Sequence, residues 1–287
     1  MKSKIGLYTI IHYFIDVIVL GIIVSSLYFL GPLIVKEPLL NMVILLVAAI
    51  MVLFIKALRL YIIMFGSKSS WLDFFKIYSK SMIVTILFPF KLGEIFRMYY
   101  FGRYSGNLLS GVVYILLDRF IDTWALVSLI LVFLLVSHMQ FFNILYLFII
   151  FLVFSLVCYL IYPAINNSIK EFLIDAPATK RRIYLLRILR SFERIYNRIS
   201  LSIKGKGVIL YVMSIVAWII EVGSLVMINK VNIGVFEFPN LSQYLSSSLI
   251  SNTGSCEYTS FSIISILFLA ITYFLIKLCS IFKSKEK

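Results

Sequence analysis

Charged residues are scarce in this chain of 287 residues, at 14%, whereas hydrophobic residues account for 62%. Average soluble domains contain about 25% charged and about 45–50% apolar residues. A water-soluble fold of this length cannot bury so much apolar surface. The composition therefore excludes an ordinary soluble protein and indicates a membrane protein.

Residue patterns of known catalytic or metal sites are also missing. The three cysteines, Cys158, Cys256 and Cys279, lie far apart and form no C-x-x-C pair, so they specify neither a disulfide framework nor a metal site. No H-E-x-x-H, G-x-S-x-G or P-loop pattern occurs, which leaves a hydrolase or a nucleotide-driven pump without support. We predict no cofactor, no metal ion and no catalytic residue, and we expect a transporter rather than an enzyme.

Long apolar runs are abundant, and six of them reach the roughly 20 residues that cross a bilayer. These runs are residues 5–30, 39–65, 108–136, 141–162, 208–228 and 261–282. The first run follows Lys2 and Lys4 as in a signal peptide, yet it is longer than a signal-peptide core and contains His12 and Asp16. We therefore interpret it as the first membrane helix.

The few charges are unevenly distributed along the chain. Lys and Arg number 27 against 13 Asp and Glu, and half of the net charge of +14 lies in residues 164–207, which hold ten basic and three acidic residues. Basic segments stay on the cytoplasmic side of a membrane. We expect this segment to be cytoplasmic, and the lysines near both ends of the chain place both termini on the same side of the cytoplasmic (inner) membrane.

Part of the basic segment, residues 180–204, has an amphipathic pattern. Apolar residues recur at spacings of three and four, while Arg187, Arg190, Arg194 and Arg198 fall on the opposite face. We expect a helix in the membrane interface with its arginines near anionic headgroups. It serves either as a topology anchor or to gather anionic lipid substrates. One basic stripe in a membrane protein does not predict nucleic-acid binding.

Two further stretches are apolar but interrupted: residues 71–100 contain Pro89 and Gly93, and the serine-rich residues 241–258 contain Gly254 and Glu257. All basic segments stay inside only if each stretch enters and leaves the membrane on one side. Irregular backbone at membrane depth must be covered by protein or water, and paired breaks are typical of inverted-repeat transporters. We predict an all-α polytopic membrane protein with six transmembrane helices and two re-entrant helical hairpins in an inverted-repeat arrangement.

The whole chain, residues 1–287, forms one membrane domain in this interpretation. Residues 1–163 are the first half and contain the re-entrant stretch 71–100. Residues 164–207 are the basic cytoplasmic segment. Residues 208–287 are the second half and contain the re-entrant stretch 241–258.

Charges cluster around the first break. Lys91, Glu94 and Arg97 follow Pro89, and Glu94 and Arg97 are three residues apart, so they share one helix face. Charges at membrane depth are functional candidates by default. The alternative is a surface turn whose cations only mark the cytoplasmic side.

The helix predicted after this break contains Asp118, Arg119 and Asp122. The two carboxylates are four residues apart and share a face, and Arg119 either neutralises one of them or reaches Glu94. This group is either a structural ion pair between helices or part of a functional site.

Charges also lie in the second and fifth apolar runs. Lys56 and Arg59 end the second run and are expected to extend to the cytoplasmic headgroups, although Arg59 could instead reach a phosphate in a cavity. Glu221 is an acid within the membrane without an obvious partner in the sequence.

The order of these motifs resembles the flippase-like membrane region of lysylphosphatidylglycerol synthases. The matching residues are Pro89, Gly93, Glu94 and Arg97, then Asp118, Arg119 and Asp122, then Gly254 and Glu257. The resemblance implies two inverted halves with re-entrant helices around a lipid-sized cavity. It also implies that an anionic or aminoacylated phospholipid, or a lipid-linked saccharide, moves between leaflets. Because the chain stops at Lys287, we expect a stand-alone membrane domain without the aminoacyl-transferase domain.

We therefore expect a lipid translocase whose partners are membrane phospholipids or a lipid-linked saccharide. Lys91 and Arg97 would hold the phosphate, and Glu257 would serve the exterior-facing side. Glu94, Asp118 and Asp122 would pair with the cations or contact a cationic headgroup.

Two other hypotheses stay open. One is a membrane-embedded enzyme of polyprenyl-linked glycan synthesis, with Asp118 and Asp122 as its catalytic pair. The other is a non-catalytic membrane partner of an envelope-lipid synthase. Association of the chain with itself is a further partner hypothesis.

Overall fold

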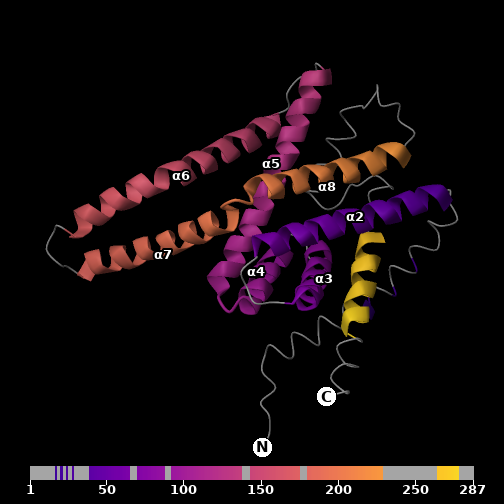
Figure 1. The fold of residues 1–287 in the computed structure, drawn as a ribbon, viewed down its shortest axis with the longest axis horizontal. Helices are drawn as coiled ribbons and strands as arrows, with labels where there is room; N and C mark the ends of the chain where they lie inside the picture. Colours follow the sequence, from indigo (N-terminus) through magenta and orange to yellow (C-terminus); the bar gives the residue numbers. More distant parts are fainter. Residues whose placement is uncertain are drawn as a thin grey trace, which may run out of the picture. The chain divides into compact units, whose positions relative to one another are not determined.

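A computed structural model describes residues 39–64, 70–87, 92–137, 143–174, 180–228 and 264–277, together with a few isolated positions between 17 and 28. The labelled helices are α2 (Leu39–Ile63), α3 (Trp71–Leu87), α4 (Leu92–Tyr104), α5 (Leu108–Ser137), α6 (Asn143–Ile174), α7 (Lys180–Ile203) and α8 (Gly207–Ile228), shown in Figure 1. A further apolar helix covers Ile264–Lys277. No strand occurs in this part of the chain, so the predicted all-α class is confirmed there.

Three of these helices are long and apolar enough to cross a membrane. The candidate spans are Met42–Ile63 in α2, Ile149–Ile174 in α6 and Gly207–Ser224 in α8. They confirm that the chain is a membrane protein. The arrangement of six spans with two re-entrant hairpins stays a prediction, and the second interrupted stretch, residues 241–258, lies outside the described residues.

The chain divides into two compact units. One consists of residues Met1–Leu58, Ser67–Phe101 and Val216–Lys287. The other consists of Arg59–Gly66 and Gly102–Ile215. Helices α2, α4 and α8 each continue from one unit into the other, because the division falls inside them.

In the first unit, α3 and α4 form an antiparallel helical hairpin at the predicted break. Ser70 caps α3, because its Oγ accepts the backbone N–H of Asp73 at 3.2 Å. Near the break, the Thr85 hydroxyl donates to the Gly93 carbonyl at 3.3 Å. At the other end of the hairpin the ring of Phe74 packs 5.8 Å from that of Phe101. The interruption seen in the sequence therefore does separate two paired half-helices.

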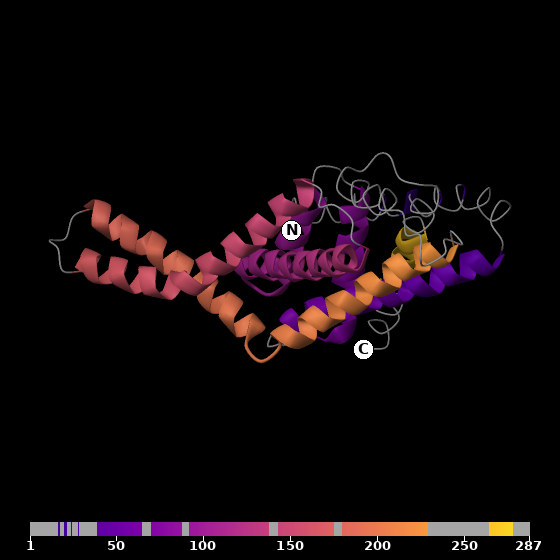
Figure 2. The same cartoon turned by 90° about the horizontal axis from the view of Figure 1, so that it is seen from above.

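In the second unit, α6 and α7 run side by side in opposite directions, as Figure 1 and Figure 2 both show. The ring of Tyr196 stacks on those of Tyr159 and Tyr162, at 5.1 Å and 4.8 Å between centroids. Further along, Lys170 Nζ lies 2.7 Å from Glu193 Oε2. Both α6 and α7 also contact α5. The amphipathic helix is thus held by its neighbours, while Phe192 on its apolar face stays 54% exposed.

Helix α6 is longer than the sequence pattern predicts. The apolar run ends at residue 162, and the predicted first half ends at residue 163, yet α6 continues through Pro163 to Ile174. Proline inside a helix removes one hydrogen bond and costs about 3 kcal/mol. The contacts of Tyr162 and Lys170 with α7 stabilise the helix on both sides of Pro163. The boundary between residues 163 and 164 therefore lies inside one helix.

The close approach of α3 and α4 depends on Gly93. A Cβ atom built on Gly93 would lie 2.3 Å from the Thr85 Cα, far inside van der Waals contact. We expect Gly93→Ala to separate the two half-helices and to destabilise the protein by about 1–3 kcal/mol or more. The measurement is the melting temperature of the detergent-purified protein.

The matched control is Gly223→Ala in α8, because nothing lies within 4 Å of a Cβ built there. This variant should melt at or slightly above the wild-type temperature, since alanine is the better helix former by about 1 kcal/mol. Equal melting temperatures for the two variants would contradict the close approach.

Candidate functional site

A buried arginine, Arg59 of α2, is bound by three side chains in the second unit. Arg59 Nε donates to Asp118 Oδ1 at 2.8 Å, and its Nη1 donates to Asp122 Oδ1 at 2.5 Å. Nη1 also donates to the Ser214 hydroxyl of α8, whose own proton goes to the Leu210 carbonyl at 3.1 Å. We call Arg59, Asp118, Asp122 and Ser214 the Arg59 cluster.

The Arg59 cluster is well shielded from solvent. Arg59, Asp118 and Asp122 are 2%, 3% and 7% exposed. The spacing of four residues places both carboxylates on one face of α5, as the sequence predicts. The expectation that Arg59 extends to the headgroups is wrong, because its guanidinium is buried against these two carboxylates. Breaking a buried ion pair of this kind leaves an uncompensated charge, which is strongly destabilising.

A second ion pair joins α2 and α8 within the first unit. Lys56 Nζ lies 2.8 Å from Glu221 Oε2, and it also lies 5.1 Å from the centre of the Trp218 ring. Glu221 is 7% exposed. The structure therefore supplies the partner that the sequence does not reveal, and Lys56, like Arg59, points to a carboxylate.

A third group of charges lies on the α3–α4 hairpin of the first unit. Lys80 of α3 lies 6.0 Å from the ring centre of Tyr100 on α4 and 5.6 Å from that of Tyr273. Arg97 of α4 lies 5.7 Å from the ring centre of Tyr78 on α3. Both cations are 2% exposed. We call Lys80, Arg97, Tyr78, Tyr100 and Tyr273 the hairpin cation cluster.

The hairpin cation cluster brings two buried positive charges to opposite arms of one hairpin. Cation–π contacts of this kind contribute about 0.5–2 kcal/mol, more when the cation is desolvated. Charges buried in a membrane protein are expensive and mark substrate or ion pathways. Arg97 was predicted to be such a residue, and the structure places it at a buried position on α4.

The remaining predicted site residues belong to neither of the two named clusters. Glu94 and Arg119 are half-buried on α4 and α5. Gly93 lies at the start of α4, where it allows the backbone of α3 to approach. Four predicted residues lie outside the described part of the chain, namely Lys91, Pro89, Gly254 and Glu257.

Sequence reasoning missed Lys80 and its tyrosine contacts, and it missed Ser214. Lys80 and Lys76 both lie in the interrupted apolar stretch after Trp71, and lysines there were a sign that could have been used. Ser214 has no such sign, because one serine in an apolar helix is ordinary. Its role follows only from the packing of α8 beside α2.

Comparison with known proteins yields one family. The family model described as "Lysylphosphatidylglycerol synthase TM region" matches residues 7–231, which is more than half of the chain. It includes the Arg59 cluster and both arms of the α3–α4 hairpin. No curated protein and no solved structure matches the chain.

Removing the central cation should expose the role of the Arg59 cluster. Arg59→Met leaves two buried carboxylates without their cation, so we expect a loss of about 3–5 kcal/mol in stability. The melting temperature in detergent measures this loss. The triple variant Arg59→Met, Asp118→Asn, Asp122→Asn removes both charges as well, and it should recover part of the loss. If the triple variant is no more stable than Arg59→Met alone, the cluster is not held together by charge.

Proposed function

The chain belongs to the lysylphosphatidylglycerol synthase TM region family, and on this premise we propose that it moves a phosphate-bearing lipid between the leaflets of the cytoplasmic membrane. The lipid is an anionic or aminoacylated phospholipid, or a lipid-linked saccharide. The observation that carries this proposal is the hairpin cation cluster.

Burial of Lys80 and Arg97 is the first support. Lys80 and Arg97 are each only 2% exposed. Removing a charge from water costs several kcal/mol even after relaxation, so burial of these cations destabilises the protein unless negative or polar groups bind them. Buried cations on both arms of a broken membrane segment therefore suit a site that accepts an anion from a substrate.

Phosphate is the anion that matches these groups best. The planar guanidinium of Arg97 can hold two phosphate oxygens in a bidentate arrangement. The ammonium of Lys80 is a compact charge that can contact a third oxygen or the next phosphate. A phosphodiester of a phospholipid and a diphosphate of a polyprenyl lipid both offer such oxygens.

The other predicted residues keep supporting roles in the proposal. Lys91 adds a cation at the break between the half-helices, and Glu94 pairs with a cation in the absence of lipid or contacts an aminoacylated headgroup. Glu257 serves the exterior-facing side. The two carboxylates of the Arg59 cluster act as a fixed brace, because Arg59 already binds both of them.

The proposal is tested by lipid exchange between leaflets. The full chain is reconstituted into vesicles that carry a fluorescent phosphatidylglycerol, and the fraction accessible to an external quencher is followed over time. Lys80→Met and Arg97→Met should each slow the exchange about tenfold or more, because each removes a charge-assisted hydrogen bond to phosphate worth about 1.5–3 kcal/mol. Glu94→Ala should slow the exchange of an aminoacylated lipid in particular.

The matched control is Lys76→Met, which removes a lysine one turn earlier on α3, at a half-buried position outside the cluster. It should exchange lipid at the wild-type rate. Cooperative thermal unfolding of Lys80→Met and Arg97→Met in detergent checks that both variants are folded. Wild-type exchange rates in both variants would refute the assignment of the hairpin cation cluster to the lipid pathway.

A further inference from the structure

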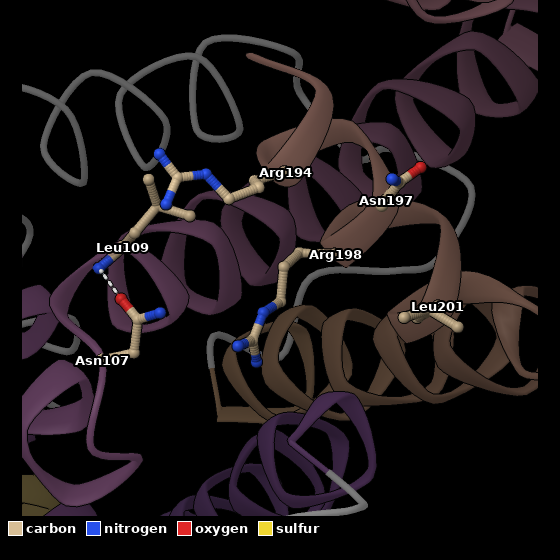
Figure 3. A pocket seen from close by; sticks show the side chains of 6 residues that line it. All are labelled: Asn107, Leu109, Arg194, Asn197, Arg198 and Leu201. Atoms are coloured by element: carbon tan, nitrogen blue, oxygen red, sulfur yellow. Dashed lines mark hydrogen bonds between the residues drawn. The ribbon is translucent and has the colours of Figure 1, made fainter. Parts of the chain in front are cut away.

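A cavity of about 270 Å³ lies in the second unit between the start of α5 and helix α7. Its lining residues are Asn107, Leu109, Arg194, Asn197, Arg198 and Leu201. Figure 3 shows Arg194 and Arg198 extending from α7 on the side where Asn107 and Leu109 begin α5. Ligand pockets for drug-sized molecules start near 300 Å³, so this cavity fits a headgroup rather than a whole lipid.

The polar lining of the cavity is positive. It contains two guanidinium groups and two amides, and none of its six lining residues is acidic. The nearest acid along α7 is Glu193, whose carboxylate pairs with Lys170 of α6. Hydrogen bonds position both arginines without neutralising them: Arg198 Nη1 donates to the Tyr114 hydroxyl at 3.3 Å, and Arg194 Nη2 donates to the Ser191 hydroxyl at 3.1 Å.

The N-terminus of α5 adds a positive potential to the cavity but offers few unused backbone N–H donors. Asn107 caps the helix, because its Oδ1 accepts the Leu109 N–H at 3.0 Å and its carbonyl accepts the Ser110 N–H at 3.0 Å. An anion in the cavity would therefore be bound by the side chains of Arg194 and Arg198. The dipole of the 30-residue α5 would contribute a smaller attraction.

Two of the lining residues are apolar. Leu201 is 71% exposed, and Leu109 is half-buried. A small positive cavity with aliphatic side chains in its lining suits an amphiphile, whose phosphate enters the cavity while its acyl chains cover the leucines.

We propose that this cavity binds the phosphate headgroup of an anionic phospholipid. The shared chemistry is a phosphate oxygen bound by Arg194 and Arg198, and the two leucines of the lining select a lipid over a soluble phosphate. The site shares no residue with the hairpin cation cluster. It therefore holds a lipid whether or not the protein moves lipids between leaflets.

Lipid binding to the detergent-purified full chain is the test, with short-chain phosphatidylglycerol as the probe and native mass spectrometry as the measurement. Short-chain phosphatidylcholine, which lacks net charge, is the reference lipid. The double variant Arg194→Gln, Arg198→Gln should bind phosphatidylglycerol about 30-fold more weakly than wild type, because two arginines near an anionic headgroup are lost. Its affinity for phosphatidylcholine should barely change.

The matched control is Arg187→Gln, Arg190→Gln, which removes two exposed arginines from the same helix outside the cavity. It should bind phosphatidylglycerol within about twofold of wild type if binding is local rather than a general charge effect. Equal losses in the two double variants would overturn the site. Binding to the detergent-purified chain is measured separately from exchange between leaflets, so that failure of the translocation proposal is distinguishable from failure of this one.

Two further experiments identify the ligand and separate loss of binding from loss of folding. Inorganic phosphate at the concentration of the lipid should not displace phosphatidylglycerol, and full displacement would overturn the assignment to a lipid.

Asn197→Asp places a negative charge in the cavity with almost no change of shape, and it should weaken phosphatidylglycerol binding about tenfold at an unchanged melting temperature. Unchanged binding in Asn197→Asp would also overturn the proposal.

Discussion

The constraint on which the rest of the structure depends is the cost of a buried charge without a partner. Arg59 satisfies it with directional bonds to two carboxylates of α5 and to a hydroxyl of α8. The rotation and register of three helices are therefore coupled at this point, since groups so shielded from solvent need their partners in place. Lys56, one turn earlier on α2, repeats the arrangement with Glu221. Helix α2 is thus positioned by two separate charge contacts rather than by its apolar surface alone.

The α3–α4 hairpin satisfies the same constraint in another way. The absence of a side chain at Gly93 allows two half-helices to approach closely, and this brings Lys80 and Arg97 against tyrosine rings of the opposite arm. A ring attracts a cation through its quadrupole but carries no formal negative charge. A ring contact can persist when the cation also binds an anion, whereas an ion pair with a carboxylate competes with the anion.

The sequence predicted the membrane class, the break near Pro89 and the shared face of Asp118 and Asp122. These follow from composition, from local backbone chemistry and from the helical period, all of which act over a few residues. The partners of Arg59 and Glu221 were not predictable, because each lies more than fifty residues away and depends on how helices pack. The continuation of α6 through Pro163 was missed for the same reason, since contacts with α7 outweigh the local cost of proline.

The basic residues therefore differ in what surrounds them, although the net charge counts every cation alike. Carboxylates hold Arg59 and Lys56, rings contact Lys80 and Arg97, and neutral hydroxyls position Arg194 and Arg198 beside a cavity. An anion gains least from the first group, because an existing ion pair must break and leave a buried charge. In our two proposals the ring-contacting cations and the cavity cations bind the anionic lipid, whereas the carboxylate-bound cations serve as a brace between helices.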